Sequence, residues 1–304
     1  MKFLSVLALP PNALQFIEAV KQDSCSLIRM GTWGVSQARF EKWTNQFCGD
    51  EEEFFAACLL NQLTWRTSKQ FDSSLRSVFR GGLSSVVIKG GHDLSLIDTV
   101  TVSKESFIRF VPVISESDPP TKSGPLVLRK AQRLFRIKNK FLCWPWQVHE
   151  QVKHGKVKKI VFVDDFLGSG SQFEDFFGKW KFNELEDIET LAYAPVIAHE
   201  LGIDVLRKNL PNVAIVSSEI LSDKQNFFSE SVWARLGQGV VTAERARAWY
   251  NDFIDSRGIR PRSLSALGVG DLGLTFGFEH ATPNNSLSIL WYASDSGWEP
   301  LLDR

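Results

Sequence analysis

The clearest hydrophobic pattern in the chain is the unbroken run Ile-Val-Phe-Val that follows Lys159. Because apolar and polar residues do not alternate in it, the run predicts a strand that is buried on both faces of a sheet. Helix and strand patterns alternate before and after this run, which predicts an α/β fold with a parallel, doubly wound sheet. The expected elements are strand 107–113, helix 125–139, strand 159–163, helix 172–180, strand 191–196, helix 198–208 and strand 213–218.

The chain is patterned differently on either side of this core. Between residues 40 and 80, aromatic and aliphatic residues recur near helical spacing, and the acidic run 50–53 suits the first turn of a helix. The glycine pair at 81–82 should end that helix. In the last third, the pattern predicts a helix at 242–256 and a strand at 274–279 that leads into a Pro/Asn turn.

The expected strand 159–163 ends in two acidic residues and a Gly/Ser turn. In a parallel sheet, ligands bind beyond the carboxyl ends of the strands, where Asp164 and Asp165 fall. Each carboxylate can accept hydrogen bonds from a diol such as the 2′ and 3′ hydroxyls of ribose. Glycines let backbone N–H groups approach a phosphate at a helix N-terminus, and hydroxyls can donate to it. The order predicts a ribose 5-phosphate site made of Asp164, Asp165, Gly168, Ser169, Gly170, Ser171 and Gln172.

A plainer interpretation of the same residues is an exposed Asp-Asp turn followed by a flexible Gly-Ser-Gly-Ser link. The dipeptide alone would favour that interpretation, but a buried strand, two acids, a Gly/Ser turn and a helix in this order favour the site.

Two other motifs are weaker. Residues 268–273, Gly-Val-Gly-Asp-Leu-Gly, fit a dinucleotide-binding fingerprint formally, but such a fingerprint opens a helix and a strand is expected here. The pair His199-Glu200 falls in an expected helix without a partner at metal-ligand spacing, so a core or surface role is expected.

Basic residues gather at 129–140 and 153–159, and aromatic residues are dense at 141–146. The basic stretches could hold nucleic acid or pyrophosphate, but charges on a helix usually form a solvated face. The aromatic segment suits a core or a partner interface, with base stacking as the alternative.

Composition narrows the class of protein. Of the 304 residues, 43% are hydrophobic, and Lys plus Arg equals Asp plus Glu at 35 each, so no net charge draws the whole molecule to nucleic acid or to an anionic membrane. Four cysteines without Cys-x-x-Cys spacing suggest reduced thiols in a cytoplasmic protein and no zinc site. The N-terminal apolar run is short for a signal peptide, so a buried segment is expected, and no stretch is long enough to span a membrane.

Residues 160–172 resemble the ribose-phosphate signature of the phosphoribosyltransferases, in which apolar residues precede two acids and a Gly/Thr-rich loop. More narrowly, residues 163–170 resemble the variant carried by phosphoribosyltransferase-like proteins of prokaryotic conflict systems, the PRTase-CE family. Three further segments carry the resemblance: Trp43-x-x-Gln46-Phe47, Ser123-Gly124, and Thr282-Pro-Asn-Asn-x-Leu-x-Ile-Leu-Trp291 before a Trp298-x-Pro300 ending.

The resemblance implies a phosphoribosyltransferase-like parallel sheet flanked by helices, with three parts: a mostly helical segment 1–90, an α/β core 91–220 and a C-terminal hood 221–304 packed on the core. Asp164 and Asp165 would hold the ribose of PRPP or of a nucleotide and help to retain a ligand-bridged Mg²⁺, with no metal site of the protein's own. Lys122, Ser123 and Gly124 would face the pyrophosphate. Gly168 and Gln172 stand where standard enzymes often have threonines, so ligand binding is more firmly implied than phosphoribosyl transfer.

The expected role is that of an effector in anti-phage defence, as in some retron cassettes. Three hypotheses stay open: an enzyme that processes nucleotides or bases, a non-catalytic nucleotide sensor, and a structural partner in a nucleoprotein complex or of another defence protein. In the hood, His280, Asn284 and Asn285 follow an expected strand and could meet a base or a partner group. The alternative is a turn whose Asn amides bond to their own backbone.

Overall fold

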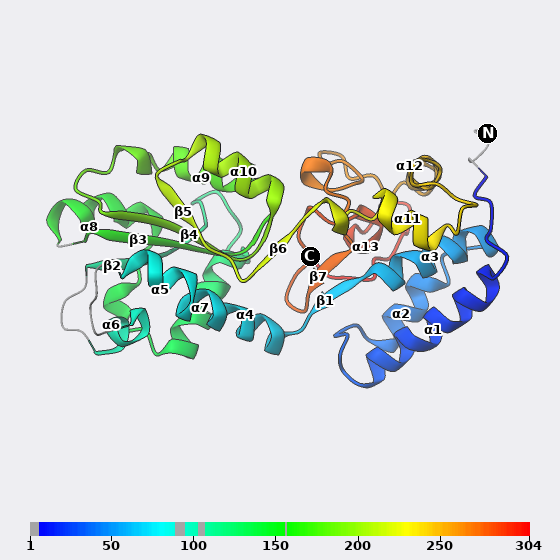
Figure 1. The fold of residues 1–304 in the computed structure, drawn as a ribbon, viewed down its shortest axis with the longest axis horizontal. Coiled ribbons are helices and arrows are strands. Elements are labelled where there is room, and N and C mark those ends of the chain that lie inside the picture. Colours follow the sequence, from blue (N-terminus) through cyan, green and yellow to red (C-terminus); the bar gives the residue numbers. More distant parts are fainter. Residues whose placement is uncertain (1–5, 89–94, 103–106, 156) are drawn as a thin grey trace. The chain divides into compact units, whose positions relative to one another are not determined.

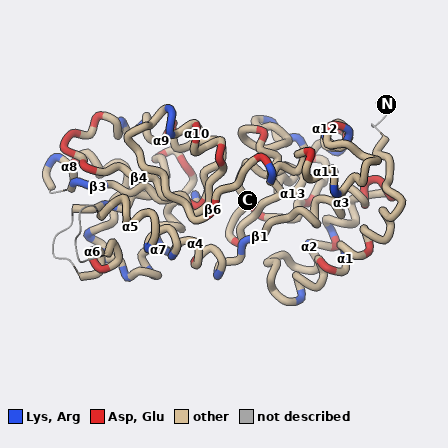
Figure 2. The backbone as a smooth tube through the Cα atoms, in the orientation of Figure 1, with Lys and Arg blue, Asp and Glu red and all other residues tan. Residues whose placement is uncertain are grey.

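The computed structural model describes residues 6–88, 95–102, 107–155 and 157–304, which form two compact units (Figure 1). The first unit joins both ends of the chain, Met1–Ser68 and Ser222–Arg304, and the second is continuous, Lys69–Leu221. Basic and acidic residues are interspersed in both (Figure 2). The division differs from the expected three parts, because the first and third parts share one core and residues 69–88 pack with the sheet. The boundary expected at residue 90 lies outside the described residues.

The second unit contains a five-stranded, all-parallel sheet, which confirms the predicted α/β class. The main strand order is β2-β3-β4-β5, and the short β6 pairs with β4 beyond the end of β5. The strands are β2 (Ile108–Pro112), β3 (Lys159–Leu167), β4 (Thr190–His199), β5 (Val213–Ile215) and β6 (Glu219–Leu221).

The chain reverses its direction across this sheet between β2 and β3. Phe110 of β2 pairs with Val161 of β3 and also forms a parallel bridge with Leu142, which must therefore lie on the outer side of β2. From β2 the chain moves outward to Leu142, then crosses back to β3 and continues to β4 and β5. Ligands of doubly wound sheets bind at such a reversal, beyond the carboxyl ends of the two strands.

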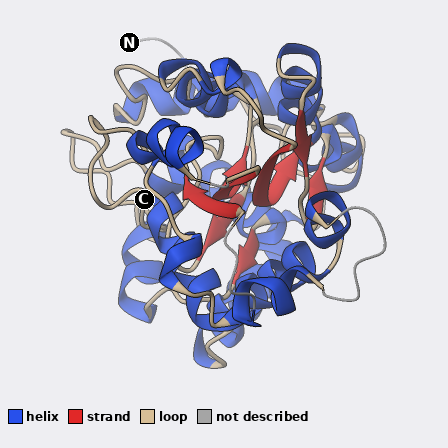
Figure 3. Cartoon of the chain, turned by 90° about the vertical axis from the view of Figure 1, so that its left-hand side faces the viewer, coloured by secondary structure: helices blue, strands red, loops and turns tan. Residues whose placement is uncertain are grey.

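Helices cover both faces of the sheet, with α9 and α10 on one side and α5 and α7 on the other (Figures 1 and 3). The face of α9 and α10 is apolar and rich in phenylalanine, with Phe162, Phe173 and Phe177 buried together. The helices of this unit are α4 (Ser68–Arg80), α5 (Gly82–Val87), α6 (Leu96–Val102), α7 (Ser123–Phe135), α8 (Val148–His154), α9 (Ser171–Lys179) and α10 (Glu200–Asn209).

Both central strands are longer than their apolar patterns suggest. β3 continues through the two acids to Leu167, and β4 runs to His199, so residues 198–199 are strand rather than helix. The register explains the extension, because Phe166 and Leu167 still pair with Ile197 and Ala198. The basic helix ends earlier than expected, at Phe135, because Arg136 takes the left-handed conformation (φ 53°) that terminates α7.

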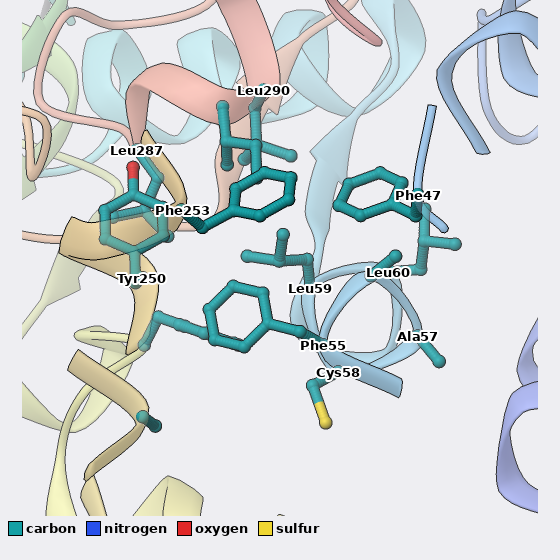
Figure 4. Close-up of a cluster of buried hydrophobic side chains, with 14 of the residues drawn as sticks. Phe47, Phe55, Ala57, Cys58, Leu59, Leu60, Tyr250, Phe253, Leu287 and Leu290 are labelled. Carbon is teal, nitrogen blue, oxygen red and sulfur yellow. The ribbon is translucent and has the colours of Figure 1, made fainter. Parts of the chain in front are cut away.

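The first unit is a mostly helical body with its own core. The face of α3 carrying Phe55 and Leu59 meets Tyr250 and Phe253 of α12, and Leu287 and Leu290 complete this cluster (Figure 4). A two-stranded parallel pair, β1 with β7, joins the two ends of the chain. The elements are α1 (Ala13–Arg29), α2 (Gln37–Thr44), α3 (Asp50–Gln62), β1 (Thr64–Arg66), α11 (Glu230–Leu236), α12 (Ala243–Arg257), β7 (Phe276–Phe278) and α13 (Ser288–Trp291).

The single helix expected over residues 40–80 was therefore wrong. Gly49, with φ 83°, precedes α3, whose first turn is the acidic run Asp50 to Glu53, as the charge pattern predicted. The strand β1 then separates α3 from α4. Residues 1–5 of the N-terminal apolar run lie outside the described residues, but Leu7 is buried in the core of this unit. Across the described ranges, no helix has the length and apolar character needed to cross a bilayer.

Candidate functional site

The acids of the predicted site lie where the sheet reverses. Pairing between β2 and β3 ends at Pro112 and Val163, and Asp164 follows at once on β3. We use "cradle" for residues 164–172, which comprise the end of β3, the Gly/Ser turn and the first turn of α9. The cradle and the start of α7 thus lie at the edge of the sheet where this fold binds ligands.

Asp164 is buried among polar contacts from three elements. Its Oδ1 accepts hydrogen bonds from the Ser123 hydroxyl of α7 at 3.1 Å and from the Asp165 backbone N–H at 3.0 Å. Its Oδ2 accepts a longer bond, 3.5 Å, from the Tyr193 hydroxyl of β4. The carboxyl group is thereby fixed in one orientation before any ligand binds.

Burial raises the pKa of Asp164 well above the usual range of a carboxyl group, and the adjacent Asp165 carboxylate raises it further. The bonds from the Asp165 N–H and from Ser123 act in the opposite sense, as does the charge of Lys122. Burial, followed by the charge of Asp164, also raises the pKa of Tyr193. Burial thus opposes the charged form of Asp164, and the contacts from Ser123, Lys122 and the Asp165 N–H favour it.

The acids were expected just beyond the carboxyl end of a strand 159–163, and the structure corrects this, because both are buried residues of β3. Asp164 is 1% exposed and Asp165 is 7% exposed, because β3 continues past them and keeps its pairing with β4. Successive side chains of a strand alternate between faces, so the two carboxyl groups lie on opposite sides of the sheet. Asp164 shares the α9 face with Phe162, two residues before it.

The turn after the acids has the geometry of a phosphate-binding loop. Gly170 precedes α9 with φ 92°, a conformation that suits glycine, and the first N–H groups of a helix have no acceptor within it. Ser169 and Ser171 hydrogen-bond to each other through their hydroxyls at 3.0 Å. Ser171 and Gln172 are exposed, whereas Gly168 and Gly170 are buried. The turn can present backbone donors and one hydroxyl pair to an anion.

The predicted pyrophosphate side meets the cradle directly. Lys122 precedes α7, and Ser123, the first residue of α7, donates the bond to Asp164. Gly124 packs against the end of β2 so closely that an added Cβ would lie 2.6 Å from the Val113 carbonyl oxygen. This close packing explains why glycine follows Ser123, and it brings the start of α7 to the acids.

Two residues of the site were missed by sequence reasoning. Tyr193 stacks on Phe173 with ring centroids 3.8 Å apart, and thereby connects Asp164 to α9. Gly202 of α10 lies against the cradle, and an added Cβ there would be 2.2 Å from the Gly168 carbonyl oxygen. The tyrosine was hidden inside an apolar strand pattern. Nothing in its helix pattern marked Gly202.

The sequence of this chain matches the model of one known protein family. The sequence profile of PRTase-CE matches residues 40–304. The chain belongs to the PRTase-CE family. The expected family resemblance is therefore confirmed, and with it the phosphoribosyltransferase-like character of this chain.

Among solved structures, this PRTase-CE chain is similar to orotate phosphoribosyltransferase from Aeropyrum pernix, with 12% identity and a TM-score of 0.30 over 56% of this chain and 76% of the other. It is also similar to the AQ2163 protein from Aquifex aeolicus, with 11% identity and a TM-score of 0.32 over 71% of this chain and 87% of the other. Scores this low carry no functional conclusion. No curated protein matches the chain.

The three residues expected to act from the hood of this PRTase-CE chain belong to the first unit. His280 stacks on Phe278 of β7, with ring centroids 4.9 Å apart. Asn285 is buried, and its Nδ2 donates to the Val269 carbonyl oxygen at 2.7 Å. The backbone carbonyl of Asn284 accepts from the Val269 N–H at 2.8 Å. Because these residues and the cradle are in different units, a role at the ligand stays a prediction.

Asn284 and Asn285 hold the glycine-rich turn 268–273 in place. From its sequence context, this turn was rejected as a dinucleotide-binding site. Gly268 is so close to the chain at Asn285 that an added Cβ would lie 2.4 Å from the Asn285 carbonyl carbon. A short 3-10 turn, Val269–Asp271, and then β7 follow, rather than a helix. The rejection of a dinucleotide fingerprint is confirmed. His199, expected in a helix, instead ends β4 as a buried residue whose Nδ1 accepts from the Leu201 N–H.

We expect Asn285→Ala to lower the free energy of unfolding by about 1 kcal/mol, because it removes the bond to Val269. Asn284→Ala is the matched control: its contribution to the same turn comes from the backbone, so its unfolding free energy should change by less than half as much. Urea unfolding measures both. Equal losses in the two variants would show that the Asn285 amide does not hold the turn.

Proposed function

We propose that this chain is a phosphoribosyltransferase-like effector of a bacterial anti-phage defence system of the retron type, and that it binds PRPP or a nucleotide through the cradle. The observation that carries the binding proposal is the Ser123 to Asp164 hydrogen bond, which joins the start of α7 to the acids at the reversal of the sheet. The defence role is supported by membership of the PRTase-CE family. Four free thiols support a cytoplasmic location.

The ligand would be held by three kinds of group. The diol of ribose would bond to the carboxyl groups, its phosphate to the N–H groups of the turn and of α9, and a pyrophosphate would face the start of α7. If the bond at C1 breaks, positive charge develops on the ribose, and the carboxylates of Asp164 and Asp165 are the groups that could stabilise it. Little covalent chemistry is then required of the protein, because positioning supplies most of the effect.

Mg²⁺ fits this site only as an ion carried by the ligand. Among the described residues, no three or more His, Cys, Asp or Glu side chains gather as metal ligands, and the oxygens of Asp164 already accept three hydrogen bonds. The ion would bridge phosphate oxygens and offset their charge. We therefore propose that Mg²⁺ strengthens PRPP binding and does not bind measurably to the protein alone, which calorimetric titration with and without PRPP can check.

A non-catalytic nucleotide sensor is the second candidate. It is favoured by the burial of Asp164, which opposes the charged form of its carboxyl group. A sensor would be stabilised against heat by its nucleotide without consuming it, whereas an enzyme would release pyrophosphate or a base. Thermal melting and mass spectrometry of the same mixtures separate the two.

We expect Gly170→Val to weaken binding of PRPP or AMP by about tenfold or more, because the side chain disfavours φ 92° and meets Val205 at 3.2 Å. Ser171→Ala should change affinity by less than about threefold, because its exposed hydroxyl is one of several donors. Isothermal titration of both variants is the test, with melting temperatures to confirm that each is folded. A larger loss in Ser171→Ala than in Gly170→Val would show that backbone donors do not form the phosphate site.

A further inference from the structure

Two tryptophans of the second unit are exposed side by side. Trp144 and Trp146 each leave 42% of their surface accessible, whereas Trp43, Trp233 and Trp249 are fully buried. The two exposed rings are nearly parallel, with an interplanar angle of 5° and centroids 5.1 Å apart. Large aromatic side chains are usually buried, so a stacked pair held in water indicates a surface that binds something.

The pair is held in place before anything binds. Next to Trp144, the Cys143 N–H donates to the Phe110 carbonyl at 3.0 Å, which fixes the segment to the outer edge of β2. The Trp144 N–H is itself bonded to Gln147 Oε1 at 3.2 Å. On the far side, Trp146 packs on Trp180, with centroids 6.2 Å apart. Few side chains therefore have to be ordered when a ligand binds here, so little of the binding free energy is lost to side-chain entropy.

The chain around the pair is strongly basic. From Lys122 to His149 it contains no Asp or Glu and seven Lys or Arg residues, namely Lys122, Arg129, Lys130, Arg133, Arg136, Lys138 and Lys140. Lys122 and Lys130 are paired with Asp118 and Asp72. The last three of the seven are exposed and lie in the short stretch that leads to the tryptophans. This local charge contrasts with the balance of the whole chain, in which Lys plus Arg equals Asp plus Glu and both signs occur in each unit (Figure 2).

Two lysines lie over aromatic rings near the pair. In the segment that leads to Trp144, the ammonium group of Lys140 lies 5.1 Å from the ring centroid of the buried Phe141. That of Lys179 lies 6.0 Å from the ring centroid of Trp180, the partner of Trp146. Glu150, on α8, is the first acidic residue after the segment. Lysines thus accompany the exposed rings, at 138 and 140 just before Trp144 in the chain and at 179 beside Trp180, which packs on Trp146.

From this arrangement we propose that the Trp144 and Trp146 pair is a stacking platform for single-stranded nucleic acid. Unpaired bases supply flat faces for the indoles, and the flanking phosphates supply negative charge for the lysines. A protein partner is less well matched, because protein interfaces are depleted of lysine around their aromatic residues. The surface lies outside the cradle, so the proposal does not depend on the function proposed above.

The test is fluorescence anisotropy with three labelled probes: a thymidine 20-mer, a uridine 20-mer and a 20-base-pair DNA duplex. We expect the full-length protein to bind at least one single strand more tightly than the duplex, and the two single strands separate DNA from RNA as the source. Trp144→Ala with Trp146→Ala should weaken that binding about fivefold or more, as expected when a stacked base loses its platform. Trp144→Phe with Trp146→Phe, which keeps flat rings, should recover most of it.

Two further variants complete the design. Leu14→Ala, which shortens a 63% exposed apolar side chain in the other unit, should bind like the wild type. Lys138→Gln with Lys140→Gln should reduce the slope of log affinity against log salt by about 0.7 for each phosphate that the protein no longer neutralises. The proposal is overturned if neither single strand binds, or if the alanine pair binds as the wild type does. It is equally overturned if the phenylalanine pair, folded by its melting temperature, binds no better than the alanine pair.

Discussion

Asp164→Asn combined with Asp165→Asn should abolish PRPP and nucleotide binding while leaving the protein as stable as the wild type, or more so, at pH 7. Each asparagine keeps the shape of the side chain but replaces one carboxyl oxygen, which could accept a ribose hydroxyl, with an NH₂ group that only donates. Hydrogen bonds to charged groups contribute about 1.5–3 kcal/mol each, so we expect an affinity loss of about 100-fold or more. Calorimetric titration checks the affinity, and urea unfolding checks the stability.

The stability half of this prediction follows from the raised pKa of Asp164, whose first cause is burial. In the unfolded chain the carboxyl group ionises at its ordinary pKa, whereas in the folded protein it keeps its proton to a higher pH. Above the ordinary pKa the unfolded state therefore binds fewer protons, and the folded protein loses stability as pH rises until the folded pKa is passed. Asp164→Asn alone removes this loss.

The wild type should thus become less stable relative to Asp164→Asn as pH is raised from about 4, the ordinary carboxyl pKa, towards neutral. Asp175→Asn, which changes an exposed acid on α9, is the matched control and should bind ligand normally. If Asp164→Asn were instead destabilising at pH 7, with a deficit that grows with pH, the buried group would be a carboxylate stabilised by its partners. Retained affinity in the folded double variant would remove the acids from the ligand site.

Gly202→Ala should destabilise the protein by about 1–3 kcal/mol and weaken ligand binding at the same time. In a helix interior this change normally adds up to about 1 kcal/mol of stability. Here the new methyl group would lie 2.2 Å from the Gly168 carbonyl oxygen and 2.9 Å from Leu167 Cδ1, so α10 or the cradle must move. The displaced group, Gly168, is the first residue of the turn proposed to bind phosphate.

The matched control is Gly178→Ala in α9, where an added Cβ meets no atom within 4 Å. It should stabilise the protein by up to about 1 kcal/mol and leave affinity unchanged. Urea unfolding and ligand titration of both variants are needed. If Gly202→Ala were as stable as Gly178→Ala, the contact between α10 and the cradle would be loose, and its role in shaping the turn would be excluded.

Local patterns were sufficient for the centre of the site. The apolar run before Asp164 favoured a buried strand, and the glycines after it favoured a turn before a helix. The acids and the turn are therefore adjacent in the sequence, and local patterns were enough to find them. Contacts across the sheet were not encoded in that way. Tyr193 reaches Asp164 only because β4 lies in a particular register beside β3, with Phe162 opposite Tyr193.

The same limit explains the division into units. β1 has three residues, too few to show a period, and its partner β7 lies more than two hundred residues later in the chain. Apolar residues recur on both sides of Gly49 and of β1, so their spacing over residues 40–80 gave no sign of the two breaks. Pairing between distant segments is set by the assembled core and not by local preference.

The joining of both chain ends in one unit has a consequence for synthesis on the ribosome. The continuous unit, Lys69–Leu221, has all its strands before residues 222–304 emerge. The helices of the first sixty-eight residues cannot complete their core until the end of translation. Their partners, α12, which covers α3, and β7, which pairs with β1, are both made after residue 221. Domains generally fold as they emerge, so Phe55 and its apolar neighbours stay uncovered through most of translation. A messenger RNA truncated after the codon for residue 221 would yield a chain with a complete cradle and with the apolar face of α3 uncovered. We expect protein quality control to recognise that exposed apolar surface.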